Sequence, residues 1–508
     1  MHESIGVMPS APADRPGRNS PVDLPRQRQI VAALRCVLPE TCILFREEDT
    51  RPYECDGLTL YRQIPMAVVL PESEAQVAQI LKLCHAMQVP IVPRGAGTGL
   101  SGSALPHAGG VLLSMAKFNR ILDIDARSRT ATVQPGVRNL AISEAAAVHR
   151  LYYAPDPSSQ IACTIGGNVA ENSGGVHCLK YGLTVHNVMR VRALTVEGEL
   201  IEFGGQALDS PGLDLLAVVI GSEGMLAVST EVTVRLVPLP LQARCIMASF
   251  ARVTDACHAV AALIAAGIIP AGLEMLDQAA SQLVEPFANA GYDLDAAAVL
   301  LCESDGTAEE VSDEIEHMSA VLRAERATRV QVSGDEAERL RFWAGRKNAF
   351  PAAGRAAPAY YCMDGTIPRR HLAQMLLSIQ SMERKYGLRC PNVFHAGDGN
   401  LHPLILFDDN DPDSVARAES FGVEILERTV QLGGTISGEH GIGVEKLDQM
   451  CTQFDRATLD AFAAVKQAFD PSGLLNPGKV VPTLHRCGEY HGPRARALAA
   501  QFPDLPRF

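Results

Sequence analysis

Hydrophobic residues between positions 71 and 88 recur with the spacing of one helix face. Apolar side chains stand at i, i+3, i+4 and i+7, namely at Val77, Ile80, Leu81 and Cys84. This spacing predicts an amphipathic helix. The apolar run at 89–92 predicts a strand directly after it, and this strand leads into a loop with many glycines.

Short runs of β-branched residues predict further strands in the first half of the chain. We expect a strand at 130–133 and two strands within 187–203, joined around Glu197-Gly198. Helices and strands do not alternate regularly here, so the pattern predicts an α+β domain rather than repeated βαβ units. The run at 232–240 contains Pro238 and Pro240, and the domain should end there.

The second half combines strands and helices in an order that predicts an antiparallel sheet covered by helices on one face. The predicted strands are 243–250, 297–303 and 328–332, and the predicted helices are 254–266, 308–326, 413–432 and 456–469. Asp470-Pro471 should end the last helix. The acidic run at 408–413 lacks the full pattern of an EF-hand loop, so we interpret it as a turn and helix cap rather than a calcium site.

Composition argues against several classes of protein. The 508 residues carry a formal charge of −13, which disfavours nucleic-acid binding. No CxxC pair occurs, so neither a zinc ribbon nor a ferredoxin-type cluster is expected. The sequence also contains no uncharged apolar stretch of about 18 residues, so we expect no membrane-spanning helix. Residues 1–25 lack the apolar core of a secretory signal, so we expect a disordered tail there and a cytoplasmic protein.

The loop at 93–106 has the composition of an anion-binding loop. Its glycines leave backbone N–H groups free to face a phosphate: Gly95, Gly97, Gly99 and Gly102. The segment 97–102 also fits GxGxxG, the fingerprint of Rossmann dinucleotide-binding folds. That fold needs a helix directly after the glycines, however, and Pro106, Gly109 and Gly110 interrupt the chain there. We therefore predict a phosphate-binding loop outside a Rossmann fold.

A second ligand-facing segment is predicted at 155–182. It contains PDPSS, TIGGN and NSGG, whose residues permit turns, positive φ and close backbone approach. We expect no regular element in it. Alone, such a segment is typical of an ordinary long loop. Together with the glycine loop and with GSEG at 221–224, it favours a ligand-binding site.

These segments resemble a known family. PRGAGTGLSG, PDPSS, TIGGNVAENSGG and GSEG are similar to the FAD-binding segments of vanillyl-alcohol oxidase-type flavoproteins, which contain a PCMH domain. The resemblance implies an α+β fold: a PCMH-type FAD-binding domain of two α+β subdomains, plus a capping domain with an antiparallel sheet and helices. Some members attach FAD through a histidine beside the glycine loop. Residues 94–102 contain none, which implies non-covalent FAD.

The resemblance also implies which residues contact FAD. The first loop should hold the pyrophosphate, and the GGN region should follow the ribityl chain and the isoalloxazine ring. The implied contacts are Arg94, Gly95, Gly97, Thr98, Gly99, Ser101, Gly102, Pro155, Asp156, Ser158, Thr164, Gly166, Gly167, Asn168, Asn172, Gly174, Gly175, Glu223 and Gly224.

Two glycine-flanked clusters in the second half carry histidine and glutamate. His395 and His402 stand on either side of Gly-Asp-Gly-Asn, a tight-turn sequence that allows both imidazoles to converge. Glu439 and His440 follow in GEHG. Two histidines and a glutamate with an open position suit a catalytic divalent metal. A single histidine is more often a polar contact of the core, but the grouping in two clusters favours the metal site.

The motifs HAGDGNLH, SGEHGIG and LLNPGK resemble the C-terminal half of FAD-dependent D-2-hydroxyacid dehydrogenases. Within that group, the segments at 346–348, 359–368 and 482–487 are most similar to the FAD-linked subunits of bacterial glycolate oxidases. The resemblance implies a divalent metal, either zinc, manganese or iron. It assigns the metal ligands to His395, His402 and Glu439, the general base to His440, the clamp of the substrate carboxylate to Arg346, and a flavin contact to Asn476.

Oxidation of a 2-hydroxyacid requires such groups. The substrate carboxylate suits bidentate pairing with arginine, and the hydroxyl proton must leave as hydride passes to flavin. A metal lowers the pKa of that hydroxyl, and a neutral imidazole can take its proton. Relatives that accept dicarboxylic substrates carry polar or basic residues where this chain has Phe350, Cys362 and Leu404, which favours glycolate or D-lactate.

On this basis we predict five parts. They are a disordered tail at 1–25, the FAD-binding domain at 26–240, the capping domain at 241–412, a C-terminal helical segment that returns to the flavin at 413–482, and a tail at 483–508. Because the chain has no pattern of cluster ligands, the resemblance implies partners that accept the electrons. These are a second FAD-type subunit and an iron–sulfur subunit, which would place the protein at the inner face of the cell membrane.

Three alternatives stay open from the sequence. A stand-alone D-lactate or D-2-hydroxyglutarate dehydrogenase would be active as an isolated chain. A metal-dependent hydrolase would use His395, His402 and Glu439 without flavin and would be colourless. A flavin-holding assembly subunit without catalysis is the third, and replacement of His440 by alanine would test it.

Overall fold

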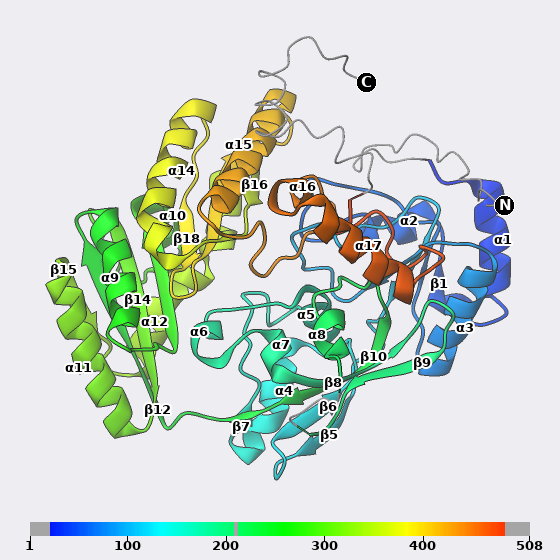
Figure 1. Cartoon of the computed structure of the whole chain (residues 1–508), viewed down its shortest axis with the longest axis horizontal. Helices are drawn as coiled ribbons and strands as arrows, with labels where there is room; N and C mark the ends of the chain where they lie inside the picture. The colour runs from blue at the N-terminus through cyan, green and yellow to red at the C-terminus, as the bar shows by residue number, and fades with distance from the viewer. Residues whose placement is uncertain (1–20, 208–211, 483–508) are drawn as a thin grey trace.

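The computed structural model of the chain describes residues 21–207 and 212–482. The described residues form sheets of four, five and eight strands and a two-stranded ribbon. Figure 1 shows the four- and five-stranded sheets, coloured from blue to green, in one part of the molecule and the large sheet, coloured from green to yellow, in the other. The chain passes from one part to the other between β11 (Val237–Pro238) and β12 (Gln242–Phe250).

The four-stranded sheet holds the glycine loop. Its strand order is β1 (Ile43–Leu44), β2 (Ala67–Val69), β4 (Val111–Ser114) and β3 (Ile91–Arg94). Strands β2, β4 and β3 run parallel. Helix α3 (Glu74–Ala86) buries its four predicted apolar residues. Between β3 and β4 the described chain contains no helix, so the prediction of a loop outside a Rossmann fold is confirmed.

Helix α1 (Leu24–Leu34) begins inside the tail predicted for 1–25. Asp23 accepts a hydrogen bond from the backbone N–H of Arg26, and Pro25 lies in the first turn, where proline is tolerated. Ile30 and Leu34 then bury the helix in the core of the first sheet. The predicted boundary at residue 25 was therefore wrong; residues 1–20 and the predicted tail at 483–508 lie outside the described residues.

The five-stranded sheet is antiparallel and supports the second ligand-facing segment. Its order is β5 (Ile121–Asp125), β6 (Thr130–Val133), β10 (Val228–Arg235), β8 (Val188–Leu194) and β9 (Leu200–Gly204). The predicted strand at 130–133 and the predicted pair within 187–203 are confirmed.

Residues 155–182 contain short helices, so the prediction of no regular element was wrong. Helix α5 (Ile165–Glu171) and helix α6 (Cys178–Tyr181) interrupt the turns. The carbonyls of Val137 and Pro135 accept hydrogen bonds from the first two backbone N–H groups of α5. Contacts with a distant loop therefore satisfy donors that a helix start leaves unpaired, and the local sequence carries no sign of them.

The large sheet has eight strands, and all neighbouring strands in it run antiparallel. Its order is β15 (Ala327–Val332), β12, β14 (Ala298–Gly306), β13 (Gly272–Asp277), β18 (Asn392–His395), β19 (Asn400–Phe407) and β16 (Ala359–Cys362), with β17 (Gly365–Thr366) also paired to β19. The predicted strands and helices of this region are present, with ends that differ by a few residues.

Helices cover both faces of this sheet, not one face as predicted. One face packs on α9 (Val253–Ala265), α11 (Ala308–Ala324), α14 (Leu372–Tyr386) and α15 (Pro412–Gln431). The other face packs on α10 (Gln278–Ala288), α12 (Glu336–Lys347) and α13 (Ala349–Ala356). In β12, Ile246 and Ala248 enter the first core, whereas Cys245 and Met247 enter the second. The strand is therefore apolar on both faces.

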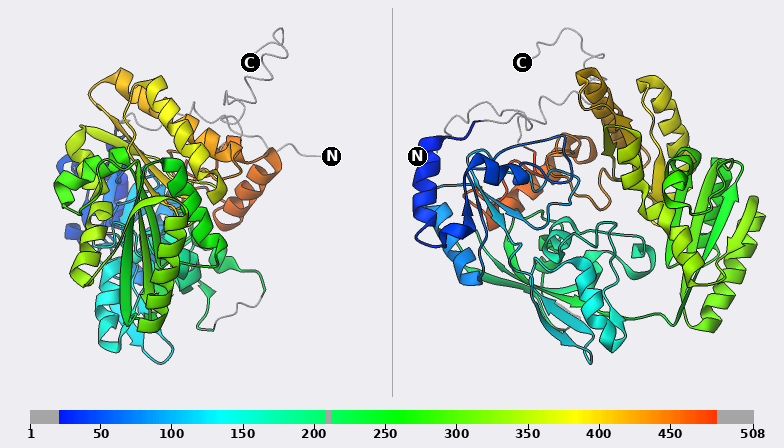
Figure 2. Two further views of the ribbon diagram at one scale, coloured as in Figure 1. Left: turned by 90° about the vertical axis from the view of Figure 1, so that its left-hand side faces the viewer. Right: turned by 180° about the vertical axis from the view of Figure 1, so that it is seen from behind.

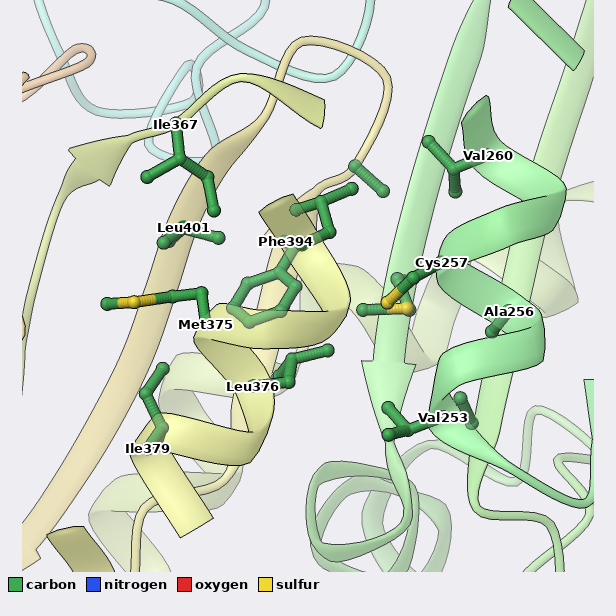
Figure 3. Packing of buried hydrophobic residues seen from close by; sticks show 14 of the residues in the cluster. Val253, Ala256, Cys257, Val260, Ile367, Met375, Leu376, Ile379, Phe394 and Leu401 are labelled. Carbon is green, nitrogen blue, oxygen red and sulfur yellow. The ribbon is translucent and has the colours of Figure 1, made fainter. Parts of the chain in front are cut away.

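The first of these cores packs against β18 and β19, the two strands that form the histidine hairpin with His395 and His402. Figure 3 shows Phe394 of β18 beside Met375 and Leu376 of α14, and Cys257 and Val260 of α9 pointing toward the same sheet. All five side chains are 3 % exposed or less. The packing holds the end of β18, and with it His395, on a rigid element.

The C-terminal segment returns to the first domain. Helix α17 (Arg456–Phe469), orange-red in Figure 1 and Figure 2, packs on the five-stranded sheet, where the ring centroid of Phe469 lies 6.2 Å from that of Phe203 in β9. After it, Leu475 forms a parallel bridge with Ile91 of β3, and Asn476 donates its backbone N–H to the Ile91 carbonyl. At the start of the segment, Asp411 caps α15, so the acidic run is a helix cap as predicted. None of the helices within the described ranges is both long and apolar enough to cross a membrane.

Candidate active site

A cavity of about 700 Å³ lies between the glycine loop, helix α5 and the loop at 438–441. Twelve of the predicted FAD contacts line it: Arg94, Gly95, Gly97, Thr98, Gly99, Ser158, Thr164, Gly166, Gly167, Asn168, Glu223 and Gly224. The segments that the sequence predicted to face one ligand thus face one cavity. At one end, the wall also contains His402, Glu439 and His440.

The glycine loop fits a cofactor that approaches the backbone closely. A Cβ at Gly95 would lie 2.3 Å from Thr164 Oγ1, and one at Gly97 would lie 2.1 Å from an Arg94 guanidinium nitrogen. Gly97 also has φ +72°, which favours glycine. Thr164 Oγ1 is buried without a hydrogen-bond partner in the described part of the chain. A cationic guanidinium, bare backbone and an unpaired hydroxyl suit the pyrophosphate and ribityl groups of FAD.

The other eight predicted FAD contacts do not line the cavity: Ser101, Gly102, Pro155, Asp156, Asn172, Gly174, Gly175 and Asn476. Several of them hold the surrounding segments together. Asn476 Nδ2 donates to the carbonyls of Ser103 and Glu223, at 2.9 and 2.7 Å. Asp156 accepts from the backbone N–H of His177 and lies 2.8 Å from its Nδ1. The sequence motif therefore includes residues that shape the cavity without reaching its surface.

The two histidines of the hairpin converge, as the turn between them predicted. His395 ends β18 and His402 lies in β19, and their ring centroids are 4.9 Å apart. Glu439 Oε1 lies 3.2 Å from His395 Nε2 and 2.8 Å from His402 Nε2. The three ligand atoms lie within 4.8 Å of one another. Two imidazoles and a carboxylate in this arrangement can hold a divalent metal.

A buried carboxylate orients the first histidine. Glu274 Oε1 lies 2.7 Å from His395 Nδ1, which leaves Nε2 to face Glu439. Burial alone would lower the pKa of His395, but Glu274 and Glu439 raise it well above its usual value. Carboxylates that bind the second nitrogen of a ligand histidine fix its tautomer and orientation.

Arg346 pairs with this same carboxylate. Its Nε lies 2.6 Å from Glu274 Oε2, and both side chains are 2 % exposed or less. Its Nη2 lies 3.5 Å from His395 Nε2. The neighbours Lys347 and Asn348 line the cavity, and Arg346 does not. Its predicted pairing with the substrate carboxylate therefore stays a prediction.

The loop that carries Glu439 and His440 is held by Asp364. The backbone N–H groups of Gly438, Glu439 and His440 donate to its carboxylate at 3.0, 3.1 and 2.8 Å. Lys446 Nζ lies 3.0 Å from Asp364 Oδ2, and both of these side chains are fully buried. Burial alone would raise the pKa of Asp364, but Lys446 holds it below its usual value.

His440 itself is kept neutral. Burial lowers the pKa of His440 to about 4, although Asp364 opposes this effect. Its ring stacks on His402 with centroids 4.9 Å apart, and its Nδ1 is buried without a partner in the described residues. A neutral imidazole with a free nitrogen at the cavity wall can accept a proton.

The residues that the sequence linked to substrate size do not share one surface. Phe350 lines the cavity together with Tyr360, and the two ring centroids are 5.8 Å apart. Cys362 and Leu404 are paired across β16 and β19 and lie in the core behind the histidines. At position 350 the cavity wall is therefore aromatic rather than cationic.

Sequence reasoning missed Glu274, Asp364 and Lys446. Each is a single charged residue, and their partners lie far away in the chain. One signal was available: Glu274 stands among the apolar residues Leu273, Met275 and Leu276 of the strand 272–277, which is buried throughout. A charge in such a strand requires a partner.

Comparisons with protein families match both halves of the chain. Residues 65–204 match the model described as FAD binding domain, and residues 239–480 match FAD linked oxidases, C-terminal domain. The chain is 59% identical over 479 residues to glycolate oxidase subunit GlcD of Escherichia coli strain K12, which covers 94% of this chain and 96% of that protein. It is 40% identical to glycolate oxidase subunit GlcD of Bacillus subtilis strain 168, over 84% of this chain and 91% of that one.

More distant relatives extend the comparison. D-lactate dehydrogenase of Anaerostipes hadrus is 31% identical, over 86% of this chain and 94% of that protein. Among solved structures, p-cresol methylhydroxylase with bound substrate superposes with a TM-score of 0.78 at 18% identity, covering 91% of this chain and 98% of that chain. The 4-ethylphenol oxidase of Gulosibacter chungangensis gives a TM-score of 0.76 at 16% identity, with 91% and 99% covered. These two structures share the fold, and the predicted PCMH-type architecture is confirmed.

Proposed function

Because the chain belongs to the FAD-linked oxidase family that includes glycolate oxidase subunit GlcD, and is thus an FAD-dependent oxidoreductase, we propose that it oxidises glycolate, and also D-lactate, to the 2-oxoacid. One observation carries this proposal: His395 and His402 converge on Glu439, and His402, Glu439 and His440 line the same cavity as the glycine loop. A hydroxyl bound there would meet a Lewis acid and a base together.

The donor set at this end supports a divalent metal. Two imidazole nitrogens and one carboxylate oxygen suit zinc, manganese or iron and leave positions open for a substrate. Glu274 supports His395 from behind, as in many histidine-bound metal sites. We propose that His395, His402 and Glu439 hold the metal.

Each side chain has a defined task in this proposal. When bound, FAD supplies the acceptor for the hydride from the α-carbon, and the metal lowers the pKa of the substrate hydroxyl. His440 takes the hydroxyl proton at Nδ1, which no described group occupies. Arg346 pairs with the substrate carboxylate through its Nη groups while its Nε stays on Glu274. Asp364 fixes the backbone of Glu439 and His440 by accepting their N–H groups.

The parts of the chain would divide the work as follows. Residues 26–240 hold FAD non-covalently, residues 241–412 cover the substrate and supply the histidine hairpin, and residues 413–482 bring the base back to the flavin. The preference for a small substrate would rest on Phe350, which presents an aromatic ring to the cavity where relatives that accept dicarboxylic substrates carry a polar or basic residue.

The electrons must leave the flavin after each turnover. The two GlcD relatives are named as subunits, so we propose that this chain also works in a glycolate oxidase complex. A second FAD-type subunit and an iron–sulfur subunit would take the electrons and hold the chain at the inner face of the membrane. A tagged chain expressed in its own cells should copurify with a flavoprotein and an iron–sulfur protein. Recovery of the chain alone under mild detergent would contradict the complex.

The test of the reaction is a reductive titration. Glycolate, D-lactate and L-lactate are added separately, without oxygen, to the FAD-loaded chain. We expect the visible flavin band to bleach with glycolate and D-lactate and to persist with L-lactate. A band that none of the three bleaches would contradict the proposal, and so would a purified chain that binds no FAD.

A pair of histidine variants sharpens this test. His440→Ala should keep the flavin spectrum and slow the bleaching by about 100-fold or more, the usual contribution of a general base. His258→Ala, on the exposed side of α9, serves as the control and should bleach at the normal rate. Equal rates in the two variants would remove His440 from the mechanism.

A further inference from the structure

A second set of metal ligands overlaps the first and contains a thiol. Cys362, His402 and His440 bring one sulfur and two imidazole nitrogens within 4.8 Å of one another. His402 belongs to both sets, whereas Cys362 and His440 belong only to this one. The set arises because Cys362 ends β16 beside β19, while the ring of His440 stacks on His402.

Within residues 21–207 and 212–482, the Cys362 thiol has no strong competing contact. Cys362 is a free cysteine, and its Sγ makes one weak hydrogen bond, at 3.5 Å, to the carbonyl of the next residue, Met363. It lies behind the cavity wall and does not line the cavity. Substrate binding therefore does not require the sulfur.

The imidazoles are also placed to accept a cation. His440 Nδ1 is buried without a partner in the described residues, and His402 Nδ1 has only a long contact, 3.4 Å, to the Met363 carbonyl. Both histidines line the cavity, so a cation can reach this set through the opening that admits substrate.

The two sets differ in chemical softness. His395, His402 and Glu439 present nitrogen and oxygen, whereas Cys362, His402 and His440 present sulfur and nitrogen. Thiolate ligands select soft cations, and zinc-group ions bind mixed sulfur and nitrogen sites tightly. The cation displaces the thiol proton, which is released to solvent as the sulfur–metal bond forms.

We propose that Cys362, His402 and His440 form an inhibitory site for thiophilic cations such as cadmium. Because His402 and His440 take part in both functions, a soft cation held by Cys362 removes the base and one ligand of the oxygen-containing set at once. Cation binding does not depend on which hydroxyacid the protein oxidises, whereas the inhibition rests on the proposed roles of His402 and His440.

Cadmium binding to the FAD-loaded full chain tests this directly. The thiolate-to-cadmium charge-transfer band in the ultraviolet reports a bond from cadmium to sulfur and requires no turnover. We expect the wild type to show this band at one equivalent of cadmium. Cys362→Ser, which is nearly isosteric, should lose it and bind cadmium at least about 100-fold more weakly, since even outer-shell changes cost about 10–100-fold.

Matched variants separate the two sets. Cys390→Ala removes another fully buried free cysteine of the same domain and should leave the band unchanged. Glu439→Gln removes a ligand of the oxygen-containing set only, and it should also keep the band. His440→Ala should weaken cadmium binding while the flavin spectrum shows that the fold is retained.

Other patterns would overturn the inference. A band that persists in Cys362→Ser would assign the sulfur to a different cysteine. Cadmium that binds without the band, and whose binding is lost in Glu439→Gln, would occupy the oxygen-containing set instead. Neither result would bear on the reductive titration, so failure of this inference and failure of the proposed function can be distinguished.

Discussion

Replacement of Asp364 by asparagine tests the part of the site that the sequence did not reveal. Its carboxylate accepts three backbone N–H groups from the loop at 438–440, the Ser437 hydroxyl and the Lys446 ammonium. An asparagine has nearly the same shape. Its single carbonyl oxygen, placed at the position of Oδ2, can still accept from Ser437 and His440. The main loss is therefore the negative charge.

The magnitude follows from what that charge compensates. Lys446 Nζ is fully buried, and without Asp364 its nearest carboxylate is Glu445 at 3.8 Å. Removal of one partner of a buried ion pair costs about 3–5 kcal/mol. Because Glu445 retains part of the compensation, we expect the lower end, about 3 kcal/mol of lost unfolding free energy.

A natural probe reports this loss. Trp343 is the only tryptophan of the chain and is buried in the core that α12 forms with the large sheet, so its fluorescence follows the capping domain. Urea unfolding of Asp364→Asn should show a lower midpoint, with an unchanged slope. A second substitution, Lys446→Met, removes the unpaired ammonium and should recover at least half of the loss.

Two results would refute this reasoning. A midpoint for Asp364→Asn within error of the wild type would mean that the ion pair contributes nothing. A double variant no more stable than the single one would mean that the cost lies in the backbone contacts and not in the buried charge.

Three further predictions concern the cofactor, the metal and pH. Thr164→Val removes an unpaired hydroxyl from the cavity wall and should weaken FAD binding about tenfold, measured by flavin fluorescence; unchanged affinity would mean that the hydroxyl does not touch FAD. His402→Ala should lose the bound metal, measured by elemental analysis, and keep FAD, whereas full metal content would contradict the assigned ligands. Burial lowers the pKa of Lys479 to about 8 from its usual 10.5, so between these pH values the unfolded chain binds more protons and the unfolding free energy rises with pH. Lys479→Met should abolish that rise in urea midpoints between pH 8 and 10, and a rise that persists would assign it to other groups.

Much of the fold could be predicted because its signals are local. The spacing of Val77 to Cys84 encodes α3, and Gly-Asp-Gly-Asn encodes the turn between β18 and β19. The prediction failed where contacts between segments that are distant in the sequence determine the local structure. The first two backbone N–H groups of α5 donate to the distant carbonyls of Val137 and Pro135. The second helical layer on the large sheet becomes evident only once β12 is known to be buried on both faces.

The candidate site divides in the same way. The sequence could single out His395, His402, Glu439 and His440, because they stand in motifs with glycine-rich turns, and the structure groups them. Glu274 and Asp364 could not be identified from the sequence, because their partners Arg346 and Lys446 lie 72 and 82 positions away in the chain. Arg346 was found, but its ion pair with Glu274 was not.

The bond from Asn476 to the Ser103 carbonyl joins residues 373 positions apart. At about 5–20 residues per second, a ribosome needs roughly 20–75 s to travel from one to the other. During that time the glycine loop exists without the segment that supports it and without the loop that carries His440. A nascent chain therefore holds an unfinished cavity, and the flavin can be enclosed only after Asn476 has been synthesised. Translation itself thus delays the moment at which this chain can oxidise anything.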